Sequence, residues 1–243
     1  MAGQGGYEDS VSRPLIHAVK DNLARVRERI EAAASRAGRS AEQITLVAVS
    51  KGVDLGRIRA ALEAGVQHLG ESRVQEAWSK WPDIPSGVVF HLVGHLQTNK
   101  VKRAVEMFDL IQSVDSRRLA REVARRAQQR GKVQRVLLQV NTAGEESKYG
   151  VAPEELPALV EEIASLEGIA VEGLMTIGPL APEAEVRRAF RRLARLYRDL
   201  EAQQIRNVSM RYLSMGMSSD FEVAIEEGAN MVRIGTAIFG PRY

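Results

Sequence analysis

The stretch Thr45-Leu46-Val47-Ala48-Val49-Ser50-Lys51-Gly52 indicates both a fold class and a candidate site. Its first six residues are rich in β-branched side chains, which is typical of a buried strand, and Lys51-Gly52 then begins a loop. The strand therefore delivers one amine to its downstream end. A lysine at such a place usually extends its ammonium into water. It can instead act as a Schiff-base nucleophile, if burial or nearby positive charge favours the neutral amine.

Strand-like and helix-like segments alternate along the rest of the chain. An opening helix is predicted from apolar residues at helical spacing, namely Leu15, Val19, Leu23, Val26 and Ile30, with Gly38 as its stop. We expect strands at residues 45–50, 68–70, 90–94, 110–114, 133–140, 171–177, 212–215 and 231–234. We expect further helices at residues 55–64, 73–80, 100–107, 117–130, 154–165, 183–203 and 221–227.

This alternation predicts an α/β protein with a single (β/α)₈ TIM barrel and an additional N-terminal helix. We assign residues 14–243 to the barrel domain and residues 1–13 to a flexible N-terminal tail, since Gly3, Gly5 and Gly6 stand there beside acidic residues. An open doubly wound sheet is the alternative, but no Gly-x-Gly-x-x-Gly follows the first strand. In a barrel, all strand ends share one mouth, so Lys51, Glu71, Ser113, Asn141, Thr176, Ser214 and the Gly235-Thr236 pair should converge there.

Composition narrows the function classes. The 243 residues include 34 basic and 31 acidic ones, and a net charge of +3 is too small to indicate nucleic-acid binding. The arginines between Arg187 and Arg198 recur at helical spacing, which favours a solvated helix face over an RNA-binding surface. There is no cysteine and no apolar run of the roughly 20 residues that span a bilayer, and because residues 1–13 lack an apolar core we expect no signal peptide there. We therefore expect a cytoplasmic monomer with no membrane or nucleic-acid partner.

Two segments have the chemistry of an anion site. In TIM barrels the loops after strands 7 and 8 often hold a phosphate, and here residues 213–220 read Leu-Ser-Met-Gly-Met-Ser-Ser-Asp and residues 233–236 read Arg-Ile-Gly-Thr. Small residues let backbone amides approach phosphate oxygens, and the hydroxyls of Ser218 and Thr236 can also donate. The alternative is that Ser219-Asp220-Phe221-Glu222 forms a helix capping box. Asp220 would repel a dianion, so we expect it to turn away.

Arg233 is a candidate inward-facing cation. Alternation along Met231-Val232-Arg233-Ile234 places Val232 and Ile234 toward the helices and Arg233 inside the barrel. A buried guanidinium needs a partner, which is either a carboxylate such as Glu71 or a ligand. Pyridoxal 5′-phosphate has a group for each feature: an aldehyde for Lys51, a phosphate for the two loops and a ring nitrogen for Arg233. We therefore predict a cofactor site made of Lys51, Ser214, Ser218, Arg233, Gly235 and Thr236.

Several motifs together carry a family resemblance. They are Ala-Val-Ser-Lys at residues 48–51, Gly-Glu-Ser-Arg-Val-Gln-Glu at 70–76, His-Leu-Val-Gly-His-Leu-Gln-Thr-Asn-Lys at 91–100, and residues 213–220 and 232–240. From about residue 15 to 242 the chain resembles the pyridoxal phosphate homeostasis proteins, whose barrel is similar to the N-terminal domain of alanine racemase. The resemblance implies that Lys51 forms an aldimine with the cofactor, Arg233 faces its pyridine nitrogen, and Ser218, Gly235 and Thr236 hold its phosphate. It also implies a role in vitamin B6 homeostasis, with PLP-dependent apoenzymes as partners. One departure is Ser72, where the family commonly has Asn.

The residues favour a carrier over an enzyme. Arginine is always protonated, so beside the ring nitrogen it can only donate, and an unprotonated ring is a poor electron sink. A PLP-dependent racemase is the main alternative, but alanine racemase brings its second base, a tyrosine, on a further β domain. A Schiff-base aldolase and an interaction protein that binds no chromophore are also considered. We predict no catalytic residues.

The remaining histidines and lysines give weaker signals. His91 and His95 lie four residues apart without a third ligand nearby, so no metal is expected. His17 and His68 are interpreted as packing or surface residues. Lys100 and Lys148 are expected in loops near the mouth, either as solvated charges or as transient acceptors of the cofactor.

Overall fold

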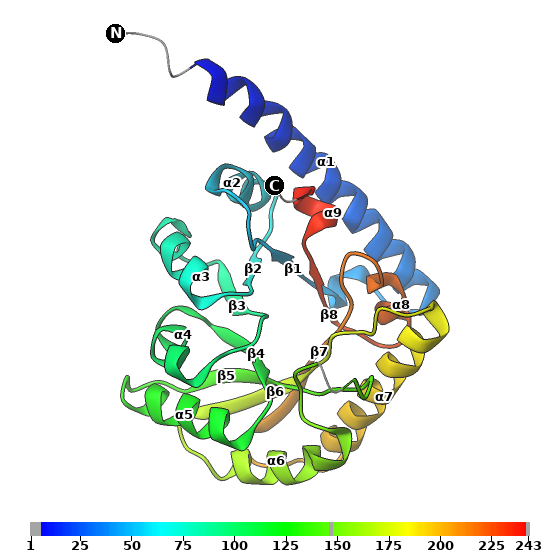
Figure 1. Ribbon diagram of the computed structural model, residues 1–243. Coiled ribbons are helices and arrows are strands. Elements are labelled where there is room, and N and C mark those ends of the chain that lie inside the picture. Colours follow the sequence, from blue (N-terminus) through cyan, green and yellow to red (C-terminus); the bar gives the residue numbers. More distant parts are fainter. Residues whose placement is uncertain (1–5, 146–147, 242–243) are drawn as a thin grey trace.

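The computed structural model describes residues 6–145 and 148–241, with side chains from residue 17 onward. Eight parallel strands form a closed barrel in sequence order, and helices surround it (Figure 1). The strands are β1 (Thr45–Val49), β2 (His68–Glu71), β3 (Val89–Leu92), β4 (Leu110–Val114), β5 (Gln134–Gln139), β6 (Ile169–Met175), β7 (Val208–Ser214) and β8 (Met231–Ile234). Because β1 pairs with β8, the predicted barrel is confirmed and the open sheet is excluded.

The predicted helices all form, with ends that differ by a few residues. They are α1 (Gly6–Arg36), α2 (Leu55–Glu63), α3 (Val74–Lys80), α4 (Val101–Met107), α5 (Arg117–Gln128), α6 (Leu156–Ala164), α7 (Glu183–Glu201) and α8 (Phe221–Glu226). A short helix that the sequence did not predict, α9 (Thr236–Phe239), follows β8. Polar residues begin several of these helices: the side chains of Asp54 and Ser116 accept the backbone N–H groups of Arg57 and Leu119 at the starts of α2 and α5.

The opening helix is longer than predicted. Helix α1 begins at Gly6, inside the segment 1–13 that was predicted to be a flexible tail, and residues 1–5 lie outside the described part. The division of the chain at residue 13 stays a prediction. Val19, Leu23, Val26 and Ile30 are buried, as the helical period predicts, while the side chain of Leu15 lies outside the described part. Helix α1 packs beside α2, α8 and α9 (Figure 1).

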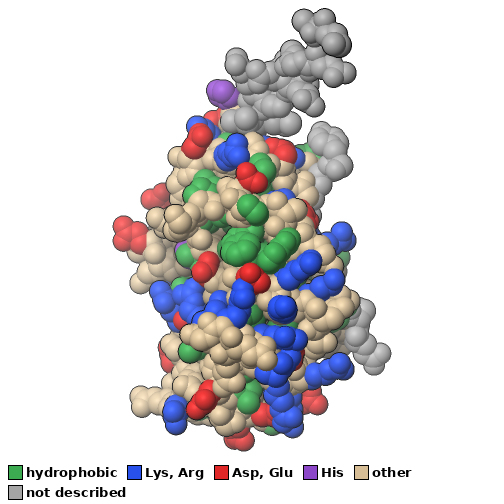
Figure 2. All heavy atoms as spheres, turned by 90° about the vertical axis from the view of Figure 1, so that its left-hand side faces the viewer, with side chains coloured by type: hydrophobic (Ala, Val, Ile, Leu, Met, Phe, Trp, Pro, Cys, Tyr) green, Lys and Arg blue, Asp and Glu red, His purple; other side chains and the backbone are tan. Residues whose placement is uncertain are grey.

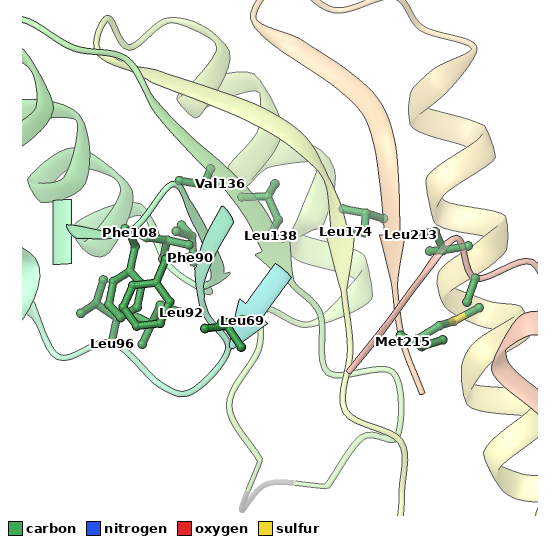
Figure 3. Close-up of a cluster of buried hydrophobic side chains, with 14 of the residues drawn as sticks. Leu69, Phe90, Leu92, Leu96, Phe108, Val136, Leu138, Leu174, Leu213 and Met215 are labelled. Carbon is green, nitrogen blue, oxygen red and sulfur yellow. The ribbon is translucent and has the colours of Figure 1, made fainter. Parts of the chain in front are cut away.

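The hydrophobic core has two parts, which follow from the alternation of side chains along each strand. The larger part lies between the strands and the helices and includes Leu69, Phe90, Leu92, Leu174 and Leu213 (Figure 3). Burial of each such side chain contributes about 1.5 to 3 kcal/mol. The smaller part fills the barrel interior and consists of Val47, Val49, Val93, Leu110, Leu137, Met175 and Met231. Arg233 shares the inner face with Met231, while Val232 and Ile234 belong to the outer part, as predicted.

Basic side chains gather on the outside of several helices. Figure 2 shows many of them on one face of the molecule, and a surface groove there is lined by Arg117, Arg118, Arg121, Arg125 and Arg126 of α5. Helix α7 also fits its sequence interpretation, because Phe190 and Leu193 are buried while Arg191 and Arg192 are exposed and paired with carboxylates. Within the described residues, every helix is too short or too polar to cross a bilayer.

Candidate functional site

A cavity of about 560 Å³ opens at the carboxyl ends of the strands. Ligand sites commonly measure about 300 to 1,000 Å³. Five of the six predicted site residues line it, namely Lys51, Ser218, Arg233, Gly235 and Thr236. The other lining residues are Val49, Ser72, Arg73, Val93, Gly94, His95, Ile177, Met217 and Ser219. Residues from both ends of the chain therefore meet at one cavity.

Barrel closure brings Lys51 and Arg233 together. In the β1–β8 pair, Val47 is opposite Arg233 and Ala48 is opposite Ile234. Lys51 follows the end of β1 and is half-buried, and Arg233 points inward from the middle of β8. The amine and the guanidinium therefore lie on neighbouring strands, although most of the chain separates them.

Arg233 is buried, with 4% of its surface exposed, and its acceptors are neutral. Its Nη1 donates to Ser214 Oγ at 2.7 Å, and its Nη2 donates to the Thr176 carbonyl at 2.7 Å. Burial lowers the pKa of Arg233 to about 10, while the negative charge of Asp220 opposes that shift. The guanidinium is therefore protonated at neutral pH. Of its five N–H groups, three have no protein acceptor among the described residues, and they can serve a ligand in the cavity.

Glu71 does not pair with Arg233, so that alternative is wrong. Gly70 occupies the inner face of β2, and the next residue, Glu71, points outward to α3. Its Oε1 accepts hydrogen bonds from Lys80 Nζ and Ser50 Oγ, each at 2.8 Å. Burial raises the pKa of the Glu71 carboxyl, although both of these bonds oppose the shift.

The same cluster fixes the backbone on both sides of Lys51. Lys80 Nζ donates to the Ser50 carbonyl at 2.8 Å, and the Glu76 carboxylate accepts the N–H of Gly52. Lys80 also pairs with Glu76, which lies one turn earlier on α3. The peptide groups that flank Lys51 are thus tied to α3, which sets the direction in which the Lys51 side chain leaves β1.

Other residues expected at the mouth lie away from the cavity. Ser113 is buried and its hydroxyl has no hydrogen-bond partner among the described residues. Asn141 holds its own loop by donating to the Glu145 carbonyl, and Thr176 is buried with its hydroxyl on the Val140 carbonyl. Ser214 is fully buried and reaches the site only through Arg233. Position at a strand end was therefore not sufficient for these side chains to reach the mouth.

The two predicted anion-binding loops contact each other. Ser218 Oγ accepts the backbone N–H groups of Gly235 and Ala237, both at 3.3 Å. Because that oxygen acts as acceptor, the Ser218 hydroxyl hydrogen can point into the cavity. The Asp220 carboxylate turns back into its own loop, as expected, and accepts the Met217 N–H at 2.6 Å. Burial raises the pKa of the Asp220 carboxyl, with the Met217 bond opposing.

The capping box considered as the alternative for residues 219–222 does not form. Helix α8 has Asp220 rather than Ser219 as its N-cap, and no side-chain hydrogen bond caps it. Ser219 lines the cavity instead. The reason is geometric: the Asp220 side chain is already committed to the Met217 N–H of the preceding turn.

Nine lining residues lie outside the predicted set, and among them Arg73, His95, Ile177 and Met217 were given no role of their own by the sequence. Strand β3 ends at Leu92, so His95 lies in the following loop, where its ring stacks on Tyr149 with centroids 3.7 Å apart. His95 Nδ1 is 3.6 Å from Asp115 Oδ2. Within the described residues, no three His, Cys, Asp or Glu side chains are grouped closely enough to hold a metal ion. The available signal was that His95 directly follows the strand predicted at residues 90–94.

Gly94 shapes this part of the wall. A Cβ atom at this position would lie 2.2 Å from the Ser72 carbonyl oxygen, which is far inside van der Waals contact. Only glycine lets the β2 and β3 loops approach so closely. Ser72 and Gly94 therefore line the cavity together.

Comparisons with known proteins agree with this geometry. The family model for the N-terminal domain of alanine racemase matches residues 22–243. A pyridoxal phosphate homeostasis protein of Aquifex aeolicus is 47% identical over 224 residues, which cover 91% of this chain and 97% of that protein. The chain belongs to the pyridoxal phosphate homeostasis protein family. A relative of the same name from Escherichia coli is 39% identical and is covered to 97%.

Two solved structures have a similar fold. PipY of Synechococcus elongatus, solved with PLP bound, matches with a TM-score of 0.79 and 37% identity, covering 91% of this chain and all of that one. An alanine racemase of Clostridium difficile matches with a TM-score of 0.74 at 16% identity, over 59% of its chain. The second likeness shows a shared barrel fold and nothing more.

Proposed function

We propose that this protein binds pyridoxal 5′-phosphate in the cavity at the barrel mouth and serves intracellular homeostasis and delivery of that cofactor. The observation that carries the proposal is the meeting of Lys51, Arg233 and the loops of Ser218 and Gly235-Thr236 in one cavity. The homologues named for this role and the PLP-bound relative support it. The buried Arg233, with three N–H groups left for a ligand, fits a cofactor that carries a ring nitrogen and a phosphate.

Each residue of the proposed site has a separate role toward the cofactor. When bound, pyridoxal phosphate supplies an aldehyde that condenses with a primary amine and releases water. Lys51 provides the amine, and α3 fixes its backbone. Arg233, which is protonated, would donate to the ring nitrogen and so favour its unprotonated form. Ser214 holds Arg233 from behind rather than contacting the ligand.

The phosphate is assigned to the loops after β7 and β8. Gly235 has no side chain to block an oxygen, and Thr236 and Ser218 offer hydroxyl donors at the same wall. Asp220, the nearest carboxylate in the loop, is turned back toward the Met217 N–H. The wall therefore presents hydrogen-bond donors to a dianion.

We further propose a carrier without turnover chemistry, acting as a cytoplasmic monomer on PLP-dependent apoenzymes. An unprotonated ring, which Arg233 would favour, would be a poorer electron sink for carbanion chemistry. A racemase is the second candidate, and it would need a second base opposite Lys51. Among the described lining residues His95 is the titratable group of that kind, and its ring is stacked on Tyr149 at the exposed rim.

One set of measurements tests both candidates. The purified protein should absorb in the visible range, and borohydride followed by peptide mapping should place the adduct on Lys51. Adding an amino acid in D₂O should produce no exchange at the α-carbon. An adduct on Lys100 or Lys148 would reject the site, and steady α-proton exchange would favour the racemase. Lys100→Ala serves as a control that keeps the visible band.

A further inference from the structure

A continuous chain of buried hydrogen bonds leads away from Arg233 through the barrel. Arg233 donates to Ser214 Oγ at 2.7 Å, and the Ser214 hydroxyl donates to Gln112 Oε1 at 2.7 Å. Gln112 Nε2 lies 3.0 Å from His91 Nδ1, and His91 Nε2 lies 2.9 Å from His68 Nδ1. These side chains come from β8, β7, β4, β3 and β2 and share the inner face of the barrel.

Each bond in the chain points the same way. Gln112 Nε2 is a donor, so His91 Nδ1 must accept, and a neutral His91 then carries its proton on Nε2. That proton is donated to His68 Nδ1, which leaves the His68 proton on Nε2. Burial lowers the pKa of His91 well below its usual range, and burial also lowers the pKa of His68, so both rings are neutral at pH 7. Donation therefore runs without reversal from Arg233 to His68, and aligned bonds polarise one another.

The chain joins the two ends of the barrel. Arg233 lines the cavity at the carboxyl ends of the strands, while His91 and His68 line a second cavity of about 490 Å³ at the amino ends. Thr45 and Val89, the first residues of β1 and β3, line this second cavity as well. Between the ends, Gln112 and Ser214 are fully buried, beside an interior cluster of Val, Leu and Met side chains with Tyr212 packed against it.

A polar path through an aliphatic interior is not needed to close the barrel, since apolar residues of similar size would fill the same space. Among the described residues, Arg233 is the charged group that is hydrogen-bonded to the path, and its other acceptor is the Thr176 carbonyl. We propose that Ser214, Gln112 and His91 are positioning residues, which fix the Arg233 guanidinium against the cofactor cavity and transmit changes at Arg233 to His68 at the opposite end of the barrel. The role of Arg233 toward the ring nitrogen rests on the proposed function. The chain of hydrogen bonds itself requires no ligand.

The first test uses the ligand-free protein. Nitrogen NMR of ¹⁵N-histidine-labelled protein at pH 7.5 should show His91 and His68 with protonated Nε2 and acceptor Nδ1 atoms. Ser214→Ala removes the donor to Gln112 and should shift the His91 nitrogen signals. Ser113→Ala is the matched control, because Ser113 is also a buried strand serine but its hydroxyl has no partner among the described residues. The proposal would be overturned if His91 carried its proton on Nδ1, or if the His91 nitrogen signals did not change in Ser214→Ala.

The second test follows pyridoxal phosphate. Titration of the wild type should move the His68 nitrogen signals, and Gln112→Met should abolish that movement and weaken binding about tenfold, the effect of one lost hydrogen bond. Gln134→Met is the control, because Gln134 is equally buried but donates to three backbone carbonyls that do not belong to this hydrogen-bond chain. It should lower stability without changing either readout. Equal binding and equal His68 response in both variants would overturn the proposal. A wild type that binds no cofactor would refute the proposed function, and the ligand-free histidine signals would still decide on the chain.

Discussion

Arg233 shows how one side chain can be both a structural burden and a functional group. It is a buried cation held by a hydroxyl and a carbonyl, with no carboxylate in hydrogen-bond contact among the described residues. A cation in this position is costly without further acceptors. A ligand that offers a ring nitrogen and negative charge would supply them, so loss of Arg233 should affect binding more than folding.

Replacing Arg233 by Gln should test this balance. The neutral amide removes the buried charge, so stability should hold or rise, while affinity for pyridoxal phosphate should fall about 10- to 100-fold through loss of a charge-assisted hydrogen bond. The visible band should also move, because the ring nitrogen can then take a proton. Absorbance titration and urea unfolding measure the two effects. Arg59→Gln, on an exposed pair with Asp83, is the control, and an unchanged band and affinity in Arg233→Gln would remove Arg233 from the site.

Thr236 is the second residue whose change is informative. Thr236→Val keeps the shape but removes the hydroxyl, and it should weaken cofactor binding by about 1 to 3 kcal/mol. Thr236→Ser should retain most of the affinity. Because Thr236 is exposed at the start of α9, neither change should alter thermal stability much. If the valine variant binds as tightly as the wild type, the phosphate lies elsewhere.

At the level of elements, α3 is the support for the site. Glu71 of β2, Ser50 after β1 and Lys80 of α3 meet in a buried cluster, with Glu71 fully buried and the Lys80 side chain 12% exposed. This cluster ties the backbone around Lys51 to a helix rather than to a loop. Movement of α3 would therefore redirect the Lys51 amine.

Lys80→Met should be strongly destabilising, by about 3 to 5 kcal/mol, because it leaves a buried carboxylate without its cation. Adding Glu71→Gln should restore most of the loss, since the uncompensated charge is then gone. Burial already raises the pKa of Glu71, so the penalty of Lys80→Met should shrink as the pH falls and the carboxyl takes up a proton. A double variant as unstable as the single one, in urea unfolding, would contradict this account.

The elements were predictable from sequence, but several side-chain roles were not. Runs of β-branched residues and helical spacing predicted all eight strands and eight of the helices, because both periods leave a direct trace in the sequence. The four-residue helix α9 left none, since Thr236–Phe239 is too short to show a period. Glu71 was misplaced because β2 extends to it, and the register there turns its side chain outward. Ser214 was expected on the inner face and does lie there, but it sits behind Arg233 and does not line the cavity. Lys51, Ser218, Arg233 and Gly235-Thr236 were expected at the barrel mouth from their chemistry and their place near strand ends, and they do line the cavity there; that they bind the cofactor stays a prediction.

The stability of the whole molecule should depend on pH, because His91 is buried in its neutral form. Burial, with His68 and Arg135 adding to it, holds the pKa of His91 well below its usual value of about 6.5. Below pH 6.5 His91 binds a proton in the unfolded chain but stays neutral in the folded protein. The contribution of neutral His91 to stability is therefore fully present above that pH and is lost as the pH falls. The slope is at most about 1.4 kcal/mol per pH unit for one proton.

Comparing the wild type with His91→Gln isolates this contribution. The variant should be less stable at pH 7.5, but its stability should fall less steeply between pH 6.5 and 5.0, by close to one proton. Urea unfolding across that range gives both slopes. His68, whose pKa is also lowered by burial, should keep part of the dependence in the variant. Parallel curves would mean that His91 takes up its proton as readily in the folded state as in the unfolded one.

The pairing of β1 with β8 has a consequence for how the protein is made. The chain is synthesised from β1 toward β8, so a growing chain exposes the amine of Lys51 long before the guanidinium of Arg233, which lines the same cavity, exists. A nascent chain of this kind cannot retain the vitamin derivative, and capture of the cofactor becomes a mark of finished synthesis. Yellow colour in the purified protein would then report on molecules in which β1 and β8 have met.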